Sequence, residues 1–312
     1  FHISPGTGAT GDFGQFRAPG LRIRVGYDER FVQRLSALAE AAGLPAGTLG
    51  ERNPALDHAT MIPVRYLQEA GYTGKIVRIG VSGLSFAKHY ELGQLIARAA
   101  AELGLKIAFV ASGDLSHKLK EDGPYGFAAD GLVFDQRMQE CFASGDFRKL
   151  LMTPADLAEN AAECGLRSFW IMAGALDRLA VDAELLSYEG PFGVGYGVAS
   201  FLVTGRDEAR NFGEQAVAEE RRHLAAIKEQ EDIYVRLARL SLETYVQSHG
   251  YAKLPDGLPG ELTQTKAGAF VSLKKDGRLR GCIGTILPTQ DSLAKEILRN
   301  AISAGTQDPR FS

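Results

Sequence analysis

A carboxylate and an imidazole lie three residues apart in the segment ASGDLSH (111–117), at Asp114 and His117. This segment follows the apolar run 107–111, which predicts a buried strand. Ligands bind at the carboxyl ends of the strands in parallel α/β sheets, so both side chains are candidate catalytic residues. Histidine suits proton transfer because its ordinary pKa lies near neutrality. The alternative is that Asp114 caps the next turn and His117 only hydrogen-bonds to it, and the spacing leaves both interpretations open.

A second polar pair, Asp57 and His58, stands just before an apolar helical segment that contains Pro63. An aspartate at this place is typical of a helix N-cap, which would make His58 an ordinary first-turn residue. The functional alternative places His58 in a catalytic site, and the pair by itself favours the capping interpretation.

A third candidate, Glu163, is followed by Cys164 and precedes the apolar segment FWIM (169–172). A carboxylate next to an apolar segment either faces solvent, which is the usual case, or is held inward by a cation or a metal ion. Glu163 is therefore a candidate metal ligand that needs support from elsewhere in the chain.

Two other motifs are set aside. The segment GTGATG (6–11) matches GxGxxG, but no apolar strand precedes it and the residues after it begin a helix poorly, which argues against a dinucleotide site. Residues 113–117 lack the flanking glycines of the GxSxG nucleophile elbow, so a serine hydrolase is not favoured.

Alternating strand and helix patterns surround these candidates. The patterns predict strands at 21–25, 76–81 and 107–111, and helices at 31–42, 90–103, 134–143 and 168–176, with a glycine-rich closing hairpin or edge strand within 184–203. This order predicts an α/β fold with a mixed, largely parallel sheet flanked by helices.

The character of the sequence changes after Gly205. We predict a first domain at 1–205, a charged helical linker at 206–232, and a second, incomplete α+β domain at 233–312. In the second domain, Lys275-Asp276-Gly277 separates two apolar runs and predicts a hairpin turn. The chain begins at Phe1 and ends without a closing helix, so we expect it to be a fragment of a longer protein.

Composition narrows the class of partner. There are 35 Lys and Arg residues against 38 Asp and Glu residues, which gives no positive excess for binding nucleic acid or an acidic membrane. The three cysteines form no CxxC pair, and the apolar runs are much shorter than the roughly 20 residues of a membrane-spanning helix. We therefore expect a cytoplasmic protein with a small ligand or a protein partner.

Taken together and in this order, the motifs resemble a known family. Asp57-His58 with Pro63, then residues 112–117, then Glu163-Cys164 ahead of MAGAL (172–176), are similar to the LigB-like catalytic subunit of class III extradiol dioxygenases. The branch called AmmeMemoRadiSam system protein B, to which Memo-type proteins are related, is the most similar, and residues 188–196 share its pattern. The second domain resembles the start of an AMMECR domain, the protein A component, in the segments GAFVSL (268–273) and LRGCIG (279–284).

The resemblance implies a non-haem Fe(II) site that opens the ring of a catechol-type aromatic substrate. It makes His117 the acid/base, with Asp114 beside it, and His58 a partner that steadies oxygen or substrate. Glu163 becomes the carboxylate of a two-histidine, one-carboxylate iron site. Cys164 occupies a place where Memo-type relatives use a thiol.

The same resemblance places the two metal histidines upstream of Phe1, so this chain by itself is not expected to hold iron tightly. It also implies an alternative function, a non-catalytic Memo-like module that binds a metal or a peptide beside a radical SAM partner. Cys282 is either a nucleophile or a core cysteine, and a homo-oligomer remains open.

Overall fold

The computed structural model describes residues 1–50, 53–275 and 278–310. The chain forms two compact units, Phe1–Ala218 and Glu219–Ser312. In the part of the chain that the structure describes, every helix is too short or too polar to cross a bilayer.

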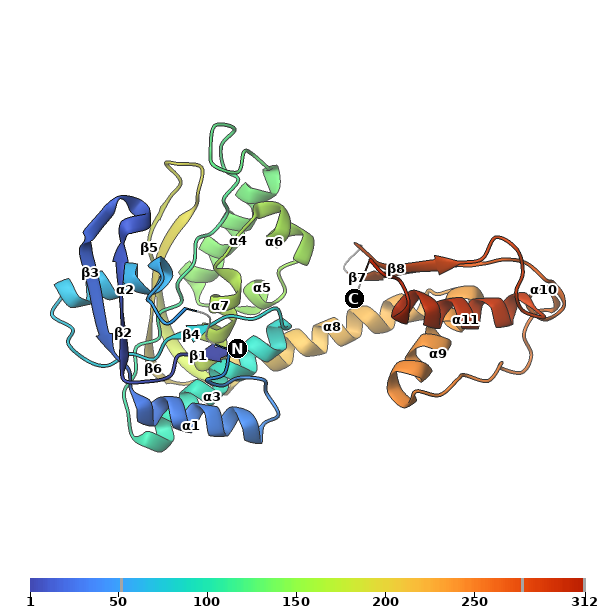
Figure 1. Cartoon of the computed structure of the whole chain (residues 1–312), viewed down its shortest axis with the longest axis horizontal. Coiled ribbons are helices and arrows are strands. Elements are labelled where there is room, and N and C mark those ends of the chain that lie inside the picture. Colours follow the sequence, from blue (N-terminus) through green and yellow to red (C-terminus); the bar gives the residue numbers. More distant parts are fainter. Residues whose placement is uncertain (51–52, 276–277, 311–312) are drawn as a thin grey trace. The chain divides into compact units, whose positions relative to one another are not determined.

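Helices form a large part of the first unit (Figure 1). They are α1 (Glu29–Ala41), α2 (His58–Glu69), α3 (Phe86–Leu103), α4 (Ala129–Ser144), α5 (Arg148–Leu151), α6 (Ala155–Ala161), α7 (Leu166–Ala175) and α8 (Phe212–Glu229), which begins in this unit and ends in the second. The helices predicted at 31–42, 90–103, 134–143 and 168–176 are confirmed as α1, α3, α4 and α7.

The strands form antiparallel pairs. They are β1 (His2–Ile3) with β4 (Ile79–Gly80), β2 (Gly8–Phe13) with β3 (Ala18–Gly26), and β5 (Leu179–Glu189) with β6 (Tyr196–Arg206). The mixture of helices and strands agrees with an α/β class, but the largely parallel sheet that we predicted is not found among the described residues. Parallel pairing there is limited to two isolated bridges, between His2 and Gly47 and between Tyr27 and Ile76.

The predicted strand at 107–111 explains part of this difference. Phe109 and Ala111 pack against the core, as the apolar pattern requires, while Val110 is exposed. A strand also needs a neighbouring backbone with which to pair. None of the described segments pairs with residues 107–111, so the segment is not a strand, and the predicted strand 76–81 is reduced to β4.

The main core of the first unit lies between α4, α7 and the β5–β6 hairpin. Its fully buried side chains include Leu115, Phe134, Met138, Phe147 and Leu150. Leu115 belongs to the loop that carries Asp114 and His117, so the core anchors the candidate site directly. A second core lies between α1 and α3.

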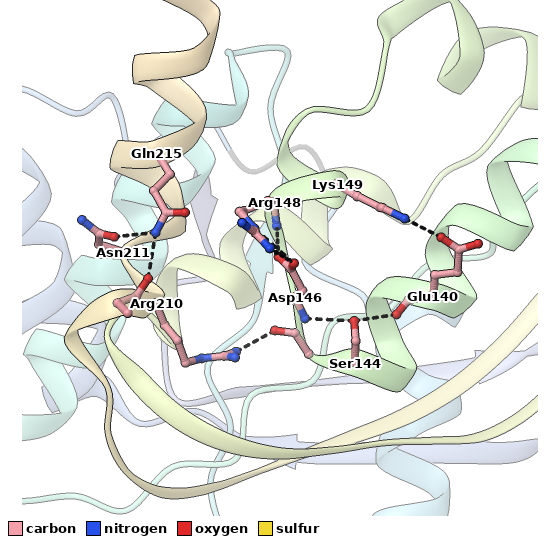
Figure 2. A network of polar contacts seen from close by, with 10 residues as sticks. Glu140, Ser144, Asp146, Arg148, Lys149, Arg210, Asn211 and Gln215 are labelled. Atoms are coloured by element: carbon pink, nitrogen blue, oxygen red, sulfur yellow. Dashed lines mark hydrogen bonds and ion pairs between the residues drawn. The ribbon is translucent and has the colours of Figure 1, made fainter.

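Arg210 ties the start of α8 to the first unit (Figure 2). Its guanidinium donates to the Gly145 carbonyl at 2.7 Å and lies over the rings of Phe147 and Phe212. Burial lowers the pKa of Arg210, although Asp207 and Asp146 oppose this effect. The charged segment that follows forms the helix α8.

The second unit contains the end of α8 and α9 (Ile233–Ser248), α10 (Gly260–Gln264), β7 (Phe270–Lys275), β8 (Arg278–Gly284) and α11 (Leu293–Thr306). β7 and β8 pair antiparallel, which agrees with the predicted hairpin. The predicted turn residues Asp276 and Gly277 lie outside the described residues. Leu237, Leu262, Ala294, Ala301 and their neighbours form the core of this unit.

Candidate functional site

The loop that carries Asp114 and His117 is fixed by backbone hydrogen bonds on both sides. Leu115 N–H donates to the Gly195 carbonyl at 2.9 Å, and Gly195 N–H donates to the Ser116 carbonyl at 2.7 Å. His117 N–H donates to the Ala161 carbonyl at 3.0 Å. The loop is therefore held between the start of β6 and the end of α6, although it is not itself a strand.

Asp114, His117 and Cys164 come together at this loop. His117 Nε2 lies 3.2 Å from Asp114 Oδ2 and 3.9 Å from Cys164 Sγ. One ligand atom from each residue lies within 4.8 Å of the others, and Cys164 is exposed. Among the described residues, this is the group of His, Cys, Asp and Glu side chains that could hold a metal ion.

Cys164 reaches the group because its own segment packs closely on the loop. A Cβ atom at Gly113 would lie 2.3 Å from Gly165 Cα, so only glycine allows this approach. Cys164 Sγ accepts from Asp114 N–H at 3.2 Å. Burial raises the pKa of the Cys164 thiol, the N–H of Asp114 opposes this, and the carboxylates of Asp114 and Glu163 raise the pKa further. The sulfur is therefore a thiol that would lose its proton on binding a metal ion.

Two tyrosines adjoin the group. The ring of Tyr125 stacks on the imidazole of His117, with centroids 5.1 Å apart and planes 19° apart, and Tyr125 is exposed. Burial, followed by the negative charge of Asp114, raises the pKa of Tyr196. Our sequence analysis missed Tyr125, for which the only local signal is its place in a Gly- and Pro-containing loop after His117.

Glu163 lies next to the group but has a different contact. Its carboxylate accepts from Leu166 N–H at 2.6 Å, which satisfies a free donor in the first turn of α7. Burial raises the pKa of Glu163, and the hydrogen bond from Leu166 opposes that rise. The predicted role of Glu163 as an iron ligand stays a prediction.

Asp57 and His58 begin α2. Asp57 Oδ1 accepts from Thr60 N–H at 2.9 Å, so Asp57 is an N-cap, which agrees with the capping interpretation. Its other carboxylate oxygen pairs with Arg78 at 3.2 Å. His58 is exposed and lies against Gln15 and Phe16. These contacts are separate from those of the group at Asp114, and a shared site for His58 and His117 stays a prediction.

His89 is the fully buried histidine of α3. Its Nδ1 lies 3.0 Å from the Ser85 carbonyl, and its ring packs against Phe1 and Trp170. Burial lowers the pKa of His89, so the imidazole is neutral in the core.

Sequence comparisons divide the chain in the same way as the motifs. Residues 7–199 match the sequence model of the catalytic LigB subunit of aromatic ring-opening dioxygenase, and residues 235–312 match that of AMMECR1. A protein of Clostridium acetobutylicum is 37% identical over 310 residues, which cover 97% of this chain and 66% of the relative. A protein of Thermotoga maritima is 53% identical over 79 residues, which cover 25% of this chain and 45% of the relative.

A crystal structure of an uncharacterized protein from Pyrococcus horikoshii covers 25% of this chain and 40% of its own, at 36% identity and a TM-score of 0.24. The present chain spans 66% of the length of its Clostridium relative. Because the LigB match extends over most of the chain, the protein belongs to the family of the catalytic LigB subunit of aromatic ring-opening dioxygenases, joined here to an AMMECR1-type segment.

Proposed function

We propose that this protein acts in the cytoplasm as an Fe(II)-dependent, extradiol-type dioxygenase on a catechol-type aromatic substrate. The observation that carries the proposal is the position of His117, an imidazole held by Asp114 at the exposed Cys164. The family match over residues 7–199 supplies the class of reaction.

His117 Nε2 is the atom at which we propose that a proton moves. It lies on the side of the ring that faces Asp114 and Cys164, and the His117 side chain is 15% exposed. In the neutral ring Nδ1 would carry the proton, which leaves Nε2 free to take one from a substrate hydroxyl; the Asp114 carboxylate would then accept from Nε2–H and stabilise the imidazolium. Tyr125 fixes the plane of the imidazole by stacking on it.

The donor atoms of this region fit a divalent transition metal. Beside the acid/base His117, the carboxylate of Asp114 and the thiol of Cys164 would be the oxygen and sulfur donors to the metal ion. Glu163 is the predicted additional carboxylate. When bound, Fe(II) would supply the Lewis acidity and the electron transfer that ring opening by dioxygen requires.

The test uses the intact protein, loaded with Fe(II) without oxygen and then given catechols and dioxygen. We expect oxygen uptake with formation of a ring-opened product, and a loss of about 100-fold or more in kcat for His117→Ala. His223→Ala, which removes an exposed imidazole from α8, is the matched control. The absence of oxygen uptake with every catechol, or equal rates for wild type and His117→Ala, would disprove the enzymatic proposal.

A second candidate function is metal binding without turnover, beside a radical SAM partner. The thiol of Cys164 favours it, because a soft ligand 3.9 Å from His117 Nε2 would place both atoms on one ion. An imidazole bound to metal through Nε2 cannot exchange a proton there, so the two functions make different demands on His117.

Metal analysis of the intact protein separates the two candidates. If His117 and Cys164 are ligands, His117→Ala and Cys164→Ser lose bound metal together, whereas Cys282→Ser in the second unit retains it. If His117 is an acid/base, His117→Ala keeps its metal and loses only turnover. Retained metal without oxygen uptake, and a stable complex with a radical SAM protein, would favour the second function.

A further inference from the structure

Asp135 is a buried carboxyl group that the proposed chemistry does not use. It lies on α4 and is 1% exposed. Its Oδ1 accepts from the Ser116 N–H and its Oδ2 accepts from the Tyr188 hydroxyl, both at 2.7 Å. A buried carboxylate is unfavourable unless such donors compensate for the loss of water. Through Ser116, Asp135 contacts the loop that carries His117.

Ser116 is the residue through which Asp135 acts on this loop. It is completely buried, and its hydroxyl donates to the Ala161 carbonyl at 3.0 Å and accepts from Lys118 N–H at 3.0 Å. The next residue, His117, has its own N–H bound to the same Ala161 carbonyl. The orientation of the peptide between Ser116 and His117 is therefore fixed, and Asp135 holds one end of that segment.

The surroundings of Asp135 leave it little freedom to move. A Cβ atom at Gly195 would lie 2.0 Å from Asp135 Oδ2, so glycine is required where the residue before β6 approaches the carboxyl group. Gly195 also exchanges hydrogen bonds with the loop, through the Leu115 N–H and the Ser116 carbonyl. The strand β5, through Tyr188, the helix α4 and the loop are thus joined at one carboxyl group.

We propose that Asp135, oriented by the Tyr188 hydroxyl, is a positioning residue that sets the placement of the His117 imidazole through the backbone of Ser116. The inference rests on the proposed function for its kinetic consequence, but not for its structural one. A shift of less than 1 Å in a catalytic group changes rates strongly, so a remote support of this kind affects turnover.

The test compares Asp135→Ala with Asp135→Asn in the intact protein, with histidines labelled at Cε1 for NMR. The ring signal of His117 is assigned by its loss in His117→Ala. In Asp135→Ala we expect this signal to move or broaden, because Ser116 N–H loses its acceptor. In Asp135→Asn we expect it near its wild-type position, because the amide oxygen still accepts from Ser116 and the amide N–H₂ can donate to the Tyr188 oxygen.

Turnover supplies a second measurement. We expect kcat to fall about 10-fold to 100-fold in Asp135→Ala with KM nearly unchanged, and to recover in Asp135→Asn. The ring signal of His223, in a different part of the chain, should stay in place in both variants. If the protein has no turnover but the His117 signal still moves, the positioning role stands and the proposed enzymatic function fails.

Fluorescence of Trp170, the single tryptophan of the chain, reports whether each variant folds. If Asp135→Ala does not fold, Tyr188→Phe replaces it, because this change removes only one donor and should move the His117 signal in the same direction by a smaller amount. A folded Asp135→Ala, or a folded Tyr188→Phe in its place, that leaves the His117 signal unmoved would overturn the inference, since a purely structural role predicts lower stability without any change at His117.

Discussion

Two buried carboxyl groups, Asp135 in the first unit and Glu296 in the second, have pKa values that are shifted in opposite directions. Both are almost completely inaccessible to solvent. Burial raises the pKa of Asp135, and the hydrogen bonds from Tyr188 and Ser116 only partly oppose it. Burial also acts against ionisation of Glu296, yet the pKa of Glu296 falls to about 2. Burial alone therefore does not decide the direction in which the pKa of a carboxyl group shifts.

The number of hydrogen-bond donors decides the direction of the pKa shift. Glu296 Oε1 accepts from the hydroxyls of Thr285 and Thr289, at 2.6 and 2.9 Å. Glu296 Oε2 accepts from the N–H groups of Thr289 and Gln290, both at 2.8 Å. Four donors favour the carboxylate over the acid, whereas Asp135 has two. Glu296 thus works as a fixed anion that fastens the loop 285–290 to α11.

The largest effect that this comparison predicts is in Glu296→Gln. The amide keeps one acceptor oxygen but turns donor hydrogens toward groups that already donate, so we expect a loss of about 3 kcal/mol in the stability of the second unit. Hydrogen exchange of the α11 amides measures it. Glu220→Gln, an exposed change in α8, is the control. Equal protection in both variants would mean that the four donors do not favour the anion.

Local sequence patterns predicted two short-range contacts near the candidate site. The capping role of Asp57 follows from an aspartate before an apolar helix, and the contact of Asp114 with His117 follows from their spacing of three residues. Both interactions are short-range. Cys164 joins His117 from 47 residues away, and no periodicity encodes such a contact; the likeness to a family directed attention to that thiol.

Asp135 was not predicted for the same reason. In the sequence it is one polar residue on a helix, and its partners come from the loop before α4 and from β5. The predicted strand at 107–111 failed for a related reason, because strand formation depends on a paired neighbour that an apolar run does not specify.

The change Tyr188→Phe tests whether the two donors of Asp135 stabilise the first unit. Loss of the hydroxyl leaves Asp135 Oδ2 without its donor in a buried place, so we expect the first unit to lose about 1–2 kcal/mol of stability. Urea unfolding followed by Trp170 fluorescence measures this loss. Tyr66→Phe, which removes a hydroxyl from an exposed ring of α2, should leave the midpoint unchanged. A midpoint for Tyr188→Phe equal to that of Tyr66→Phe would show that solvent already satisfies Asp135.

A smaller effect is expected from pH. The pKa of Glu296 is about 2 in the folded protein and its ordinary value is 4.5, so its stabilising contribution is complete above pH 4.5 and disappears as the pH falls toward 2. At pH 4 the second unit should have lost at most about 1 kcal/mol through this group relative to pH 7. Hydrogen exchange of α11 at both pH values tests this. The same difference in Glu296→Gln would assign the loss to other carboxyl groups.

The smallest effect is predicted for Asp135→Asn. Because the pKa of Asp135 is raised, the folded first unit favours the neutral form of this group more than the unfolded chain does, so acidification through this group stabilises the fold. A neutral amide of the same shape should therefore change the free energy of unfolding, measured by urea unfolding, by less than about 1 kcal/mol, in contrast to Glu296→Gln. A loss as large as that of Glu296→Gln would show that Asp135, too, is required as an anion, and the contrast between the two units would disappear.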